Sequence, residues 1–330
     1  MQNDFTSIIE KINSAENIVL LVHENPDGDA VGSIISLFRA LSKMGKKVTG
    51  AIEKAPVNCE FLLNTIGKEI KTFDEINLGE EYDLCIALDC GDLNRMGEAK
   101  VLFVNAKNTA CLDHHFTNDS FADANYIKPD AAATGEIIFD LLKAMNLKID
   151  SEIATALYAA IISDTGNFSH NNTTKRTFEI VGELVEYNID VSNIAYHLFS
   201  ESSLNRIIFM GKLLQNVELF LDGKLAVLIA TKEDVEKFDL VPSELDGMVD
   251  YARYIKGVEV GIFIKPFKDI QKISIRSNGR IDVSGVASEF NGGGHKFAAG
   301  CRVKTESGEE AKRQLVDAFS KIMWFYCKLI

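Results

Sequence analysis

The feature that most constrains the fold is the polar segment HENPDGD at residues 23–29. It follows an apolar, β-branched run at 18–22, which has the length of a buried strand. After it, apolar residues recur at helical spacing over about 30–44. Chains that alternate strands with helices form parallel sheets, which carry their sites at the carboxyl ends of the strands. We therefore expect this segment at a functional edge, although its spacing alone also fits a solvated loop.

The same arrangement recurs further along the chain. Two more predicted strands end in polar residues, one in Asp89 and the next in Asp113-His114-His115. A predicted helix runs directly into Asp164. We therefore predict an α/β fold whose N-terminal part is a doubly wound, mostly parallel sheet, with these polar clusters at one edge.

The residue types at this edge favour divalent cations. Oxygen ligands with a minority of histidine suit Mg²⁺ or Mn²⁺ better than a structural Zn²⁺. His23 and Asp27 can close around one cation, and Asp29 can face a second. Asp89 has no apolar role at its strand end, so it is a candidate bridging carboxylate. Two cations that share a carboxylate suit attack on phosphorus.

Two adjacent histidines, His114 and His115, need not share one role. Side chains of neighbours in extended chain point to opposite sides. One imidazole can therefore bind a metal while the other faces a substrate or a carboxylate. The sequence alone leaves open which of the two does which.

Charge and composition narrow the class of substrate and the compartment. A net charge of −13 in 330 residues disfavours long polyanions, which need a basic track. A phosphate substrate is then expected to be small and neutralised locally. We found no membrane-length apolar run and no signal-peptide pattern, and the six scattered cysteines contain no C-x-x-C motif. These features predict a cytoplasmic protein with reduced thiols and no membrane partner.

The pattern changes in the last third of the chain, where strand pairs replace the strand–helix alternation. We predict three segments: a metal-site domain at 1–200, a helical connector at 201–222 and a smaller α/β domain at 223–330. An active-site cleft is expected between the two domains.

The smaller domain holds its own candidate residues. The run Gly292-Gly293-Gly294 can bring its backbone N–H groups close to an anion, and His295 follows directly. Arg276, at the end of a predicted strand, can clamp a phosphate in bidentate fashion. A flexible turn is the alternative interpretation of the glycine run alone.

Taken in order, the motifs HENPDGD, LD, DHH and SDT resemble the four motifs of the DHH phosphoesterases. The later RSN and GGGHKFAAG are similar to the DHH-associated C-terminal domain. Within the family, PDGDAVGS, DCGDLNR and SDTGNF resemble the two-domain bacterial nanoRNase/pAp phosphatases. The resemblance covers almost the whole chain.

The resemblance implies two divalent cations, with Mn²⁺ expected first and Mg²⁺ as the alternative. The first cation would be held by His23, Asp27 and Asp89, and the second by Asp29, Asp89, His114 and Asp164. Asp89 and His115 would be catalytic, because Asp89 bridges the cations and His115 faces the scissile phosphate. Asp113 would orient a histidine from behind.

The same resemblance implies which residues bind substrate. They would be Arg276, Ser277, Gly292, Gly293, Gly294 and His295. Arg95 and Phe168 are additional candidates for a phosphate contact and for stacking on a base. A surface arginine and a core phenylalanine are the alternative interpretations of these two residues.

The implied activity is hydrolysis of very short oligoribonucleotides (nanoRNA, dinucleotides) to mononucleotides and of pAp to AMP. The partners would be short RNA and nucleotides, not long nucleic acid; a homodimer stays open. One alternative is a phosphodiesterase for cyclic or linear dinucleotides. An alternative of another class is a metal-dependent nucleotide sensor without catalysis. The intact set of candidate metal ligands argues against a sensor.

Overall fold

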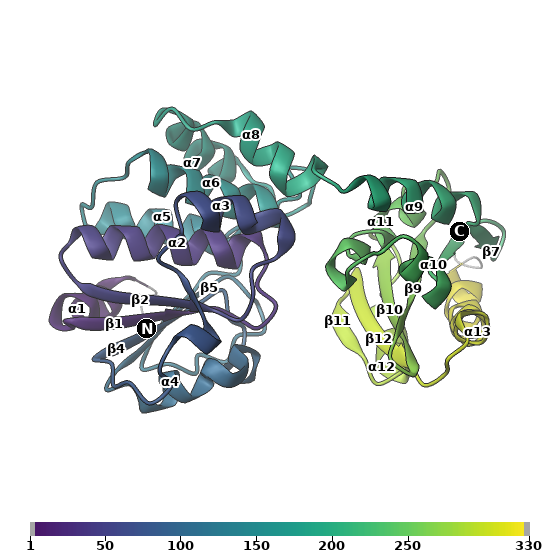
Figure 1. Cartoon of the computed structure of the whole chain (residues 1–330), viewed down its shortest axis with the longest axis horizontal. Helices are drawn as coiled ribbons and strands as arrows, with labels where there is room; N and C mark the ends of the chain where they lie inside the picture. Colours follow the sequence, from purple (N-terminus) through teal and green to yellow (C-terminus); the bar gives the residue numbers. More distant parts are fainter. Residues whose placement is uncertain (1–3, 327–330) are drawn as a thin grey trace. The chain divides into compact units, whose positions relative to one another are not determined.

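The computed structural model describes residues 4–326, apart from the side chains of residues 242, 243, 295 and 323–326. The chain divides into two compact units, Met1–Glu201 and Ser202–Ile330 (Figure 1). Within the described residues, no helix is long and apolar enough to cross a membrane.

The first unit contains a six-stranded sheet in the order β3-β2-β1-β4-β5-β6, and every strand pair is parallel. Its strands are β1 (Asn17–Leu21), β2 (Lys47–Ile52), β3 (Lys71–Thr72), β4 (Leu84–Leu88), β5 (Thr109–Asp113) and β6 (Ala124–Ile127). The strand order reverses between β1 and β4, and ligands of doubly wound sheets bind at such a reversal. The predicted doubly wound parallel sheet is confirmed.

Side chains of each central strand alternate between two apolar cores. Ile18 and Leu20 of β1 pack with the helices on one face, whereas Val19 and Leu21 pack in the core on the other face. The first face is covered by α2 (Gly28–Lys43), α5 (Thr134–Ala144) and α6 (Ser151–Asp164). The other face is covered by α4 (Lys100–Asn105), which lies below the sheet in Figure 1. Burial on both faces explains why these strands are apolar throughout.

Close packing of α2 on α6 brings distant polar residues together. A Cβ on Gly32 would lie 2.3 Å from the Ala156 carbonyl oxygen, and one on Gly28 would lie 2.4 Å from Ser163 Oγ. Only glycine therefore permits this approach. It places the beginning of α2 beside the end of α6, where Asp164 lies.

The remaining helices of the first unit complete its surface. They are α1 (Thr6–Ser14), α3 (Glu60–Thr65), α7 (Lys175–Val185) and α8 (Val191–Ala195), with a π-helical turn at Tyr196–Ser200 and 3₁₀ segments at Val57–Cys59, Phe73–Glu75 and Leu93–Ala99.

The second unit has a mixed six-stranded sheet in the order β11-β12-β10-β9-β8-β7. Only the β8–β9 pair is parallel. The strands are β7 (Glu218–Phe220), β8 (Leu225–Ile229), β9 (Val260–Phe267), β10 (Ile270–Ser277), β11 (Gly293–His295) and β12 (Ala298–Val303). The helices are α9 (Leu204–Gln215), α10 (Lys232–Lys237), α11 (Val249–Arg253), α12 (Ser284–Glu289) and α13 (Gly308–Tyr326), with a 3₁₀ segment at Pro242–Leu245. The predicted smaller α/β domain is confirmed.

Helix α9 belongs to the second unit. Its buried residues Phe209, Met210 and Leu213 share one apolar core with β8 and α11. The segment predicted as a helical connector, 201–222, therefore contributes packing to the second unit. The predicted domain limits and the cleft between the domains stay predictions.

Candidate metal centre and substrate residues

The first polar cluster lies just beyond β1. His23 is 4% exposed, and its Nδ1 lies 2.7 Å from the Glu24 carbonyl oxygen. Asp27 is the N-cap of α2 and accepts hydrogen bonds from the backbone N–H groups of Asp29 and Ala30, at 3.1 Å each. A side-chain oxygen at the N-cap is what a helix of this length needs to satisfy its first N–H groups. The strand end and the helix start thus position both side chains.

Asp89 follows β4 and faces two imidazoles at once. Its Oδ2 lies 3.7 Å from His23 Nε2, and its Oδ1 lies 3.6 Å from His114 Nε2. Its backbone φ of 54° is unusual for a residue other than glycine and costs about 1–3 kcal/mol. Strain of this kind persists where the surroundings impose it, as they do in functional sites.

His114 lies at the centre of the second cluster. Its Nε2 is 3.4 Å from Asp164 Oδ2 and 3.9 Å from Asp29 Oδ2. Its Nδ1 lies 3.3 Å from the Ala131 carbonyl oxygen, a contact that orients the ring so that Nε2 faces the carboxylates. The residues come from the ends of β5 and α6 and the start of α2.

Three overlapping groups of side chains at this edge could hold metal ions. The ligand atoms within each group lie within 4.8 Å of one another. The groups are His23, Asp27 and Asp89; Asp29, His114 and Asp164; and Asp89, His114 and His115. The first group is the set predicted for the first cation. The second group contains three of the four residues predicted for the second cation, and the fourth, Asp89, shares the third group with His114.

His115 differs from His114 in its partner. Its Nδ1 lies 2.7 Å from Asp113 Oδ1, and Asp113 Oδ2 in turn accepts a hydrogen bond of 2.7 Å from Asn118. Burial lowers the pKa of His115, but the hydrogen bond to Asp113 and the charge of Asp89 outweigh it and raise the pKa to about 9. Because His115 also lies within one possible ligand group, its predicted role at the scissile phosphate stays a prediction.

The electrostatics of the site fit divalent cations. Burial raises the pKa of Asp29 well above its ordinary value, with the charge of Asp89 adding to the effect, and burial raises the pKa of Asp164 to about 7. Burial would also raise the pKa of Asp89, but His23 and the other two histidines hold it below its ordinary value. Within the described chain, no lysine or arginine forms an ion pair with these carboxylates or with Asp27. Buried charges require a partner, and a cation would supply it.

Two functional contacts were missed in the sequence analysis. Thr134 Oγ1 donates to Asp89 Oδ1 at 3.0 Å, and Asn118 holds Asp113 as described above. A threonine before an apolar helical pattern is indistinguishable from an ordinary helix start, and Asn118 lies in a loop without periodicity. No signal in the sequence links either residue to the carboxylate that it binds.

Arg276 and Ser277 end β10 in the second unit. The Arg276 guanidinium donates to the Ile275 carbonyl oxygen, and among the described residues no carboxylate forms an ion pair with it. Burial lowers the pKa of this guanidinium below its usual value. Ser277 is nearly buried, and its Oγ accepts a hydrogen bond from the Ile281 N–H group. Arg276 therefore carries a half-buried charge without a carboxylate pair among the described residues. Such a guanidinium is suited to binding an anionic ligand.

The alternative interpretation of the glycine run as a flexible turn is wrong for residues 293–295. Residues 293–295 form β11, an edge strand paired with β12. A Cβ on Gly292 would lie 2.2 Å from the Gly300 carbonyl oxygen, and one on Gly294 would lie 2.5 Å from the Ala298 carbonyl oxygen. Only at Gly293 would a Cβ enter open space. Two of the three glycines are therefore required by packing against β12, and Gly293 is the one that a ligand could approach.

Strand pairing brings the candidate residues of the second unit onto one row. Ala298 of β12 pairs with Arg276 on one side and with His295 on the other. The side chain of His295 lies outside the described residues.

Arg95 and Phe168 belong to the first unit. Arg95 is exposed in the 3₁₀ segment after Asp89, and its charge opposes the rise in the pKa of His115. Its predicted contact with a phosphate stays a prediction. Phe168 is half-buried, and its ring centroid lies 5.3 Å from the ring centroid of Phe178. This contact fits a core role, and stacking on a base stays a prediction.

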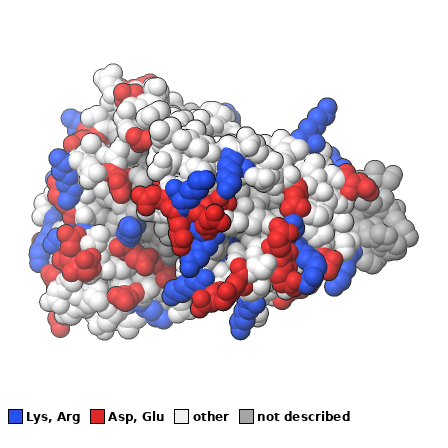
Figure 2. Space-filling view, turned by 45° about the vertical axis from the view of Figure 1, so that its right-hand side comes forward, with Lys and Arg blue, Asp and Glu red and all other residues white. Residues whose placement is uncertain are grey.

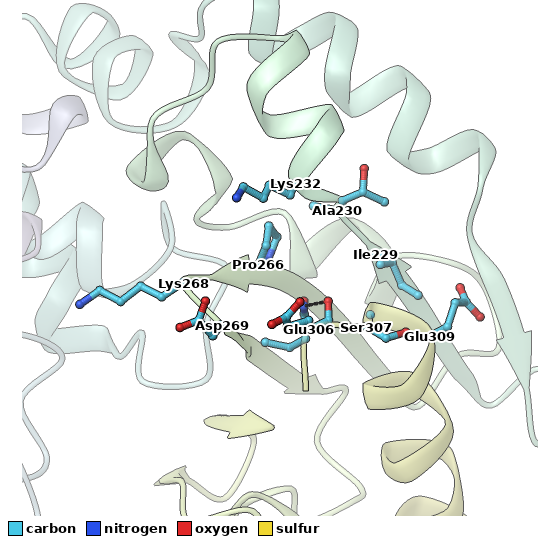
Figure 3. Close-up of a pocket in the computed structure, with 12 residues that line it drawn as sticks. Ile229, Ala230, Lys232, Pro266, Lys268, Asp269, Glu306, Ser307 and Glu309 are labelled. Carbon is cyan, nitrogen blue, oxygen red and sulfur yellow. Dashed lines mark hydrogen bonds between the residues drawn. The ribbon is translucent and has the colours of Figure 1, made fainter. Parts of the chain in front are cut away.

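A hollow of about 390 Å³ lies in the second unit, between the ends of β8 and β9 and the start of α13 (Figure 3). Its lining includes Lys232, Lys268, Asp269 and Gln271 but none of the predicted substrate residues. Gln271 precedes Arg276 by five positions on β10, which is about 17 Å at about 3.4 Å per residue. The hollow is thus distinct from the substrate residues proposed by the sequence.

Comparison with known proteins agrees with this geometry. Residues 17–161 match the DHH family, N-terminal domain, and residues 222–324 match the DHHA1 domain. The bifunctional oligoribonuclease and PAP phosphatase NrnA of Thermus thermophilus is 30% identical over 91% of this chain and 88% of its own length. The cyclic-di-AMP phosphodiesterase PdeA of Listeria monocytogenes is 28% identical over 94% of this chain and 48% of its own length.

A solved structure shows the same arrangement of elements. An exopolyphosphatase-related protein from Bacteroides fragilis superimposes with a TM-score of 0.91, at 27% identity, over 98% of both chains. With both domain matches in the expected order and a relative at 30% identity over most of its length, the chain belongs to the DHH family of phosphoesterases.

Proposed function

We propose that this phosphoesterase hydrolyses very short oligoribonucleotides to mononucleotides and pAp to AMP, using two divalent cations, with Mn²⁺ expected first and Mg²⁺ as the alternative. The observation that carries the proposal is the placement of Asp89, whose two oxygens face His23 and His114. One carboxylate can then serve two cations, which suits displacement at phosphorus. The similarity to an oligoribonuclease and PAP phosphatase supports the substrate class.

In this proposal, one cation is held by His23, Asp27 and Asp89 and the other by Asp29, Asp89, His114 and Asp164. Bound there, the cations would polarise the phosphoryl group and acidify water at neutral pH.

His115 and Asp113 act on the substrate side of the site. Asp113 Oδ1 accepts the Nδ1 proton of His115, which fixes the ring and favours the imidazolium form. The protonated ring can then donate its Nε2–H to a non-bridging oxygen of the scissile phosphate and stabilise the charge that develops there.

The second unit would bind a phosphate that is not being cleaved. Arg276 supplies a guanidinium without a carboxylate pair, and the open position at Gly293 lets the backbone of β11 approach the ligand. Ser277 and His295 would complete this contact. Such remote binding orients the scissile phosphate without taking part in the reaction.

Charge supports a short substrate. On the face shown in Figure 2, lysine and arginine side chains are interspersed with aspartate and glutamate and form no continuous basic track. With a net charge of −13, the chain lacks the long-range attraction that long nucleic acid requires. Cytoplasmic short RNA and nucleotides remain the expected partners, and a homodimer stays open.

A phosphodiesterase for cyclic or linear dinucleotides is the second candidate. It is favoured by the similarity to PdeA. The same cation ligands would serve, because cleavage of an oligoribonucleotide and of a cyclic dinucleotide both break a phosphodiester bond, and release of phosphate from pAp is likewise a displacement at phosphorus.

Product analysis separates these functions. The purified protein is incubated with pAp, pGpG, pApA, short RNAs and cyclic di-AMP, each with Mn²⁺, with Mg²⁺ or with EDTA. We expect AMP from pAp and mononucleotides from the linear substrates only when a cation is present. Faster turnover of cyclic di-AMP would favour the second candidate. Tight binding of these ligands without any product would indicate a sensor and overturn the proposal.

A further inference from the structure

The first turn of α5 contacts carboxylates from two separate parts of the chain. The Thr134 N–H group donates to Asp29 Oδ2 at 2.6 Å, and the Gly135 N–H group donates to Asp29 Oδ1 at 2.9 Å. Thr134 Oγ1 donates to Asp89 Oδ1 at 3.0 Å. Through its backbone and its side chain, Thr134 therefore binds both Asp29 and the carboxylate shared by the two cation groups.

The beginning of α5 is itself fixed relative to a third candidate ligand. The peptide of Ala132 donates its N–H to Glu136 Oε2 and accepts a hydrogen bond of 2.9 Å from Asn172. Asn172 also donates to the carbonyl oxygen of Asp164, at 3.2 Å. The segment before α5 is thus tied to the end of α6.

Close packing completes this arrangement. Thr134 has no exposed surface. A Cβ on Gly135 would lie 2.7 Å from Ala160 Cβ and 3.5 Å from Asp29 Oδ1. A glycine at this position therefore lets α5 approach both α6 and Asp29.

The bonded oxygens are the ones that face the cation groups. Asp29 Oδ2 and Asp89 Oδ1 also lie 3.9 and 3.6 Å from Nε2 of His114, a residue of the possible ligand groups. A hydrogen bond to one lone pair of each oxygen fixes the torsion of the carboxylate and leaves the other lone pair for a cation. The N–H groups of a helix N-terminus also stabilise negative charge.

We propose that Thr134 is a positioning residue that sets Asp29 and Asp89 in register for two cations. This inference rests on the proposed function. Hydrogen-bond partners of metal ligands typically change metal affinity about 10–100-fold when they are removed.

The test compares Thr134→Val, Thr134→Ser and Thr177→Val. Valine keeps the N–H bond to Asp29 and removes only the hydroxyl that binds Asp89. Thr177 is a matched control, because it is equally buried and its hydroxyl is hydrogen-bonded to Thr174 in the capping box of α7. Titration calorimetry with Mn²⁺ alone measures the number of sites and the Kd, thermal unfolding without cation measures stability, and pAp turnover gives kcat and KM.

We expect Thr134→Val to weaken Mn²⁺ binding about 10-fold or more and to lower kcat more than it raises KM. Thr134→Ser should restore binding, and Thr177→Val should lose only thermal stability. A wild-type Kd for Mn²⁺ in Thr134→Val overturns the inference. If Thr134→Val does not fold, Thr134→Ala replaces it, because alanine adds no bulk. A wild-type Kd for Mn²⁺ in that variant would overturn the inference in the same way. Failure of the wild-type protein to bind either Mn²⁺ or Mg²⁺ would instead refute the proposed function.

Discussion

The two units of the chain place polar groups in opposite ways. In the first unit, carboxylates and imidazoles crowd into a mostly buried edge of a parallel sheet, with nitrogen–oxygen distances of 3.4–3.9 Å between His114 and three aspartates. In the second unit, the half-buried Arg276, which has no carboxylate ion pair among the described residues, lies two strands away from the glycine-rich edge strand β11. Buried carboxylates that lie close together repel one another, so the stability of the whole cluster depends on each of its members. The isolated guanidinium of Arg276 affects only the ligand that it binds. Substitutions in the first unit should therefore act on every substrate, and those in the second unit should act selectively.

The largest effect is expected for Asp89→Ala. Asp89 belongs to the possible ligand group with His23 and Asp27 and to the one with His114 and His115, so its loss would remove a ligand from both. Turnover of every substrate should fall by at least about 10³-fold, the range seen when a key electrostatic group is removed. Elemental analysis should show loss of bound metal, and the exposed Asp317→Ala should behave as wild type. Two metals per chain in Asp89→Ala would contradict the bridging role.

The second-largest effect distinguishes the roles of His114 and His115. His115→Ala should keep most of its metal and lose about 10²–10⁴-fold in kcat, because it removes a group that acts on the reacting phosphate. His114→Ala should weaken the metal site formed with Asp29 and Asp164. Metal content and kcat are measured side by side. Equal metal loss in both variants would mean that both imidazoles are ligands.

Arg276→Ala sharpens the comparison between the units. Metal content should not change, and kcat/KM for pAp or a dinucleotide should fall about 10²-fold through misplacement of the substrate. A model ester with one phosphate, such as p-nitrophenyl phosphate, should be affected much less. The control is Arg280→Ala in the same unit, whose guanidinium already pairs with Glu259. An equal fall on both substrates would place Arg276 at the reaction centre and remove the distinction drawn here.

Gly293→Val should have the smallest effect, about 10-fold on kcat/KM for pAp. A Cβ at Gly293 would have no neighbour within 4 Å, and a branched side chain would block a ligand that approaches β11. Gly285→Val is the matched control, because a Cβ at Gly285 also enters open space. If the two variants have the same activity, β11 does not contact the substrate.

Much of the first unit was predictable from sequence for local reasons. The apolar runs before His23 and Asp89 identify buried parallel strands, and parallel strands place their ends at one edge. The glycine run was misread for an equally local reason. Glycine is common in turns, and only the pairing of β11 with β12 reveals that Gly292 and Gly294 avoid clashes with a neighbouring strand.

Local sequence specifies which residue types stand at which strand ends, because strand length, side-chain alternation and helix starts are local properties of the chain. How those residues meet depends on the tertiary structure. The two oxygens of Asp89 face different histidines because β1 and β5 flank β4 in the sheet, and Thr134 binds both Asp29 and Asp89 because α2, α5 and α6 approach closely at glycines. Contacts between residues so far apart in the sequence depend on how strands pair and how helices pack on the sheet, and no local pattern records either.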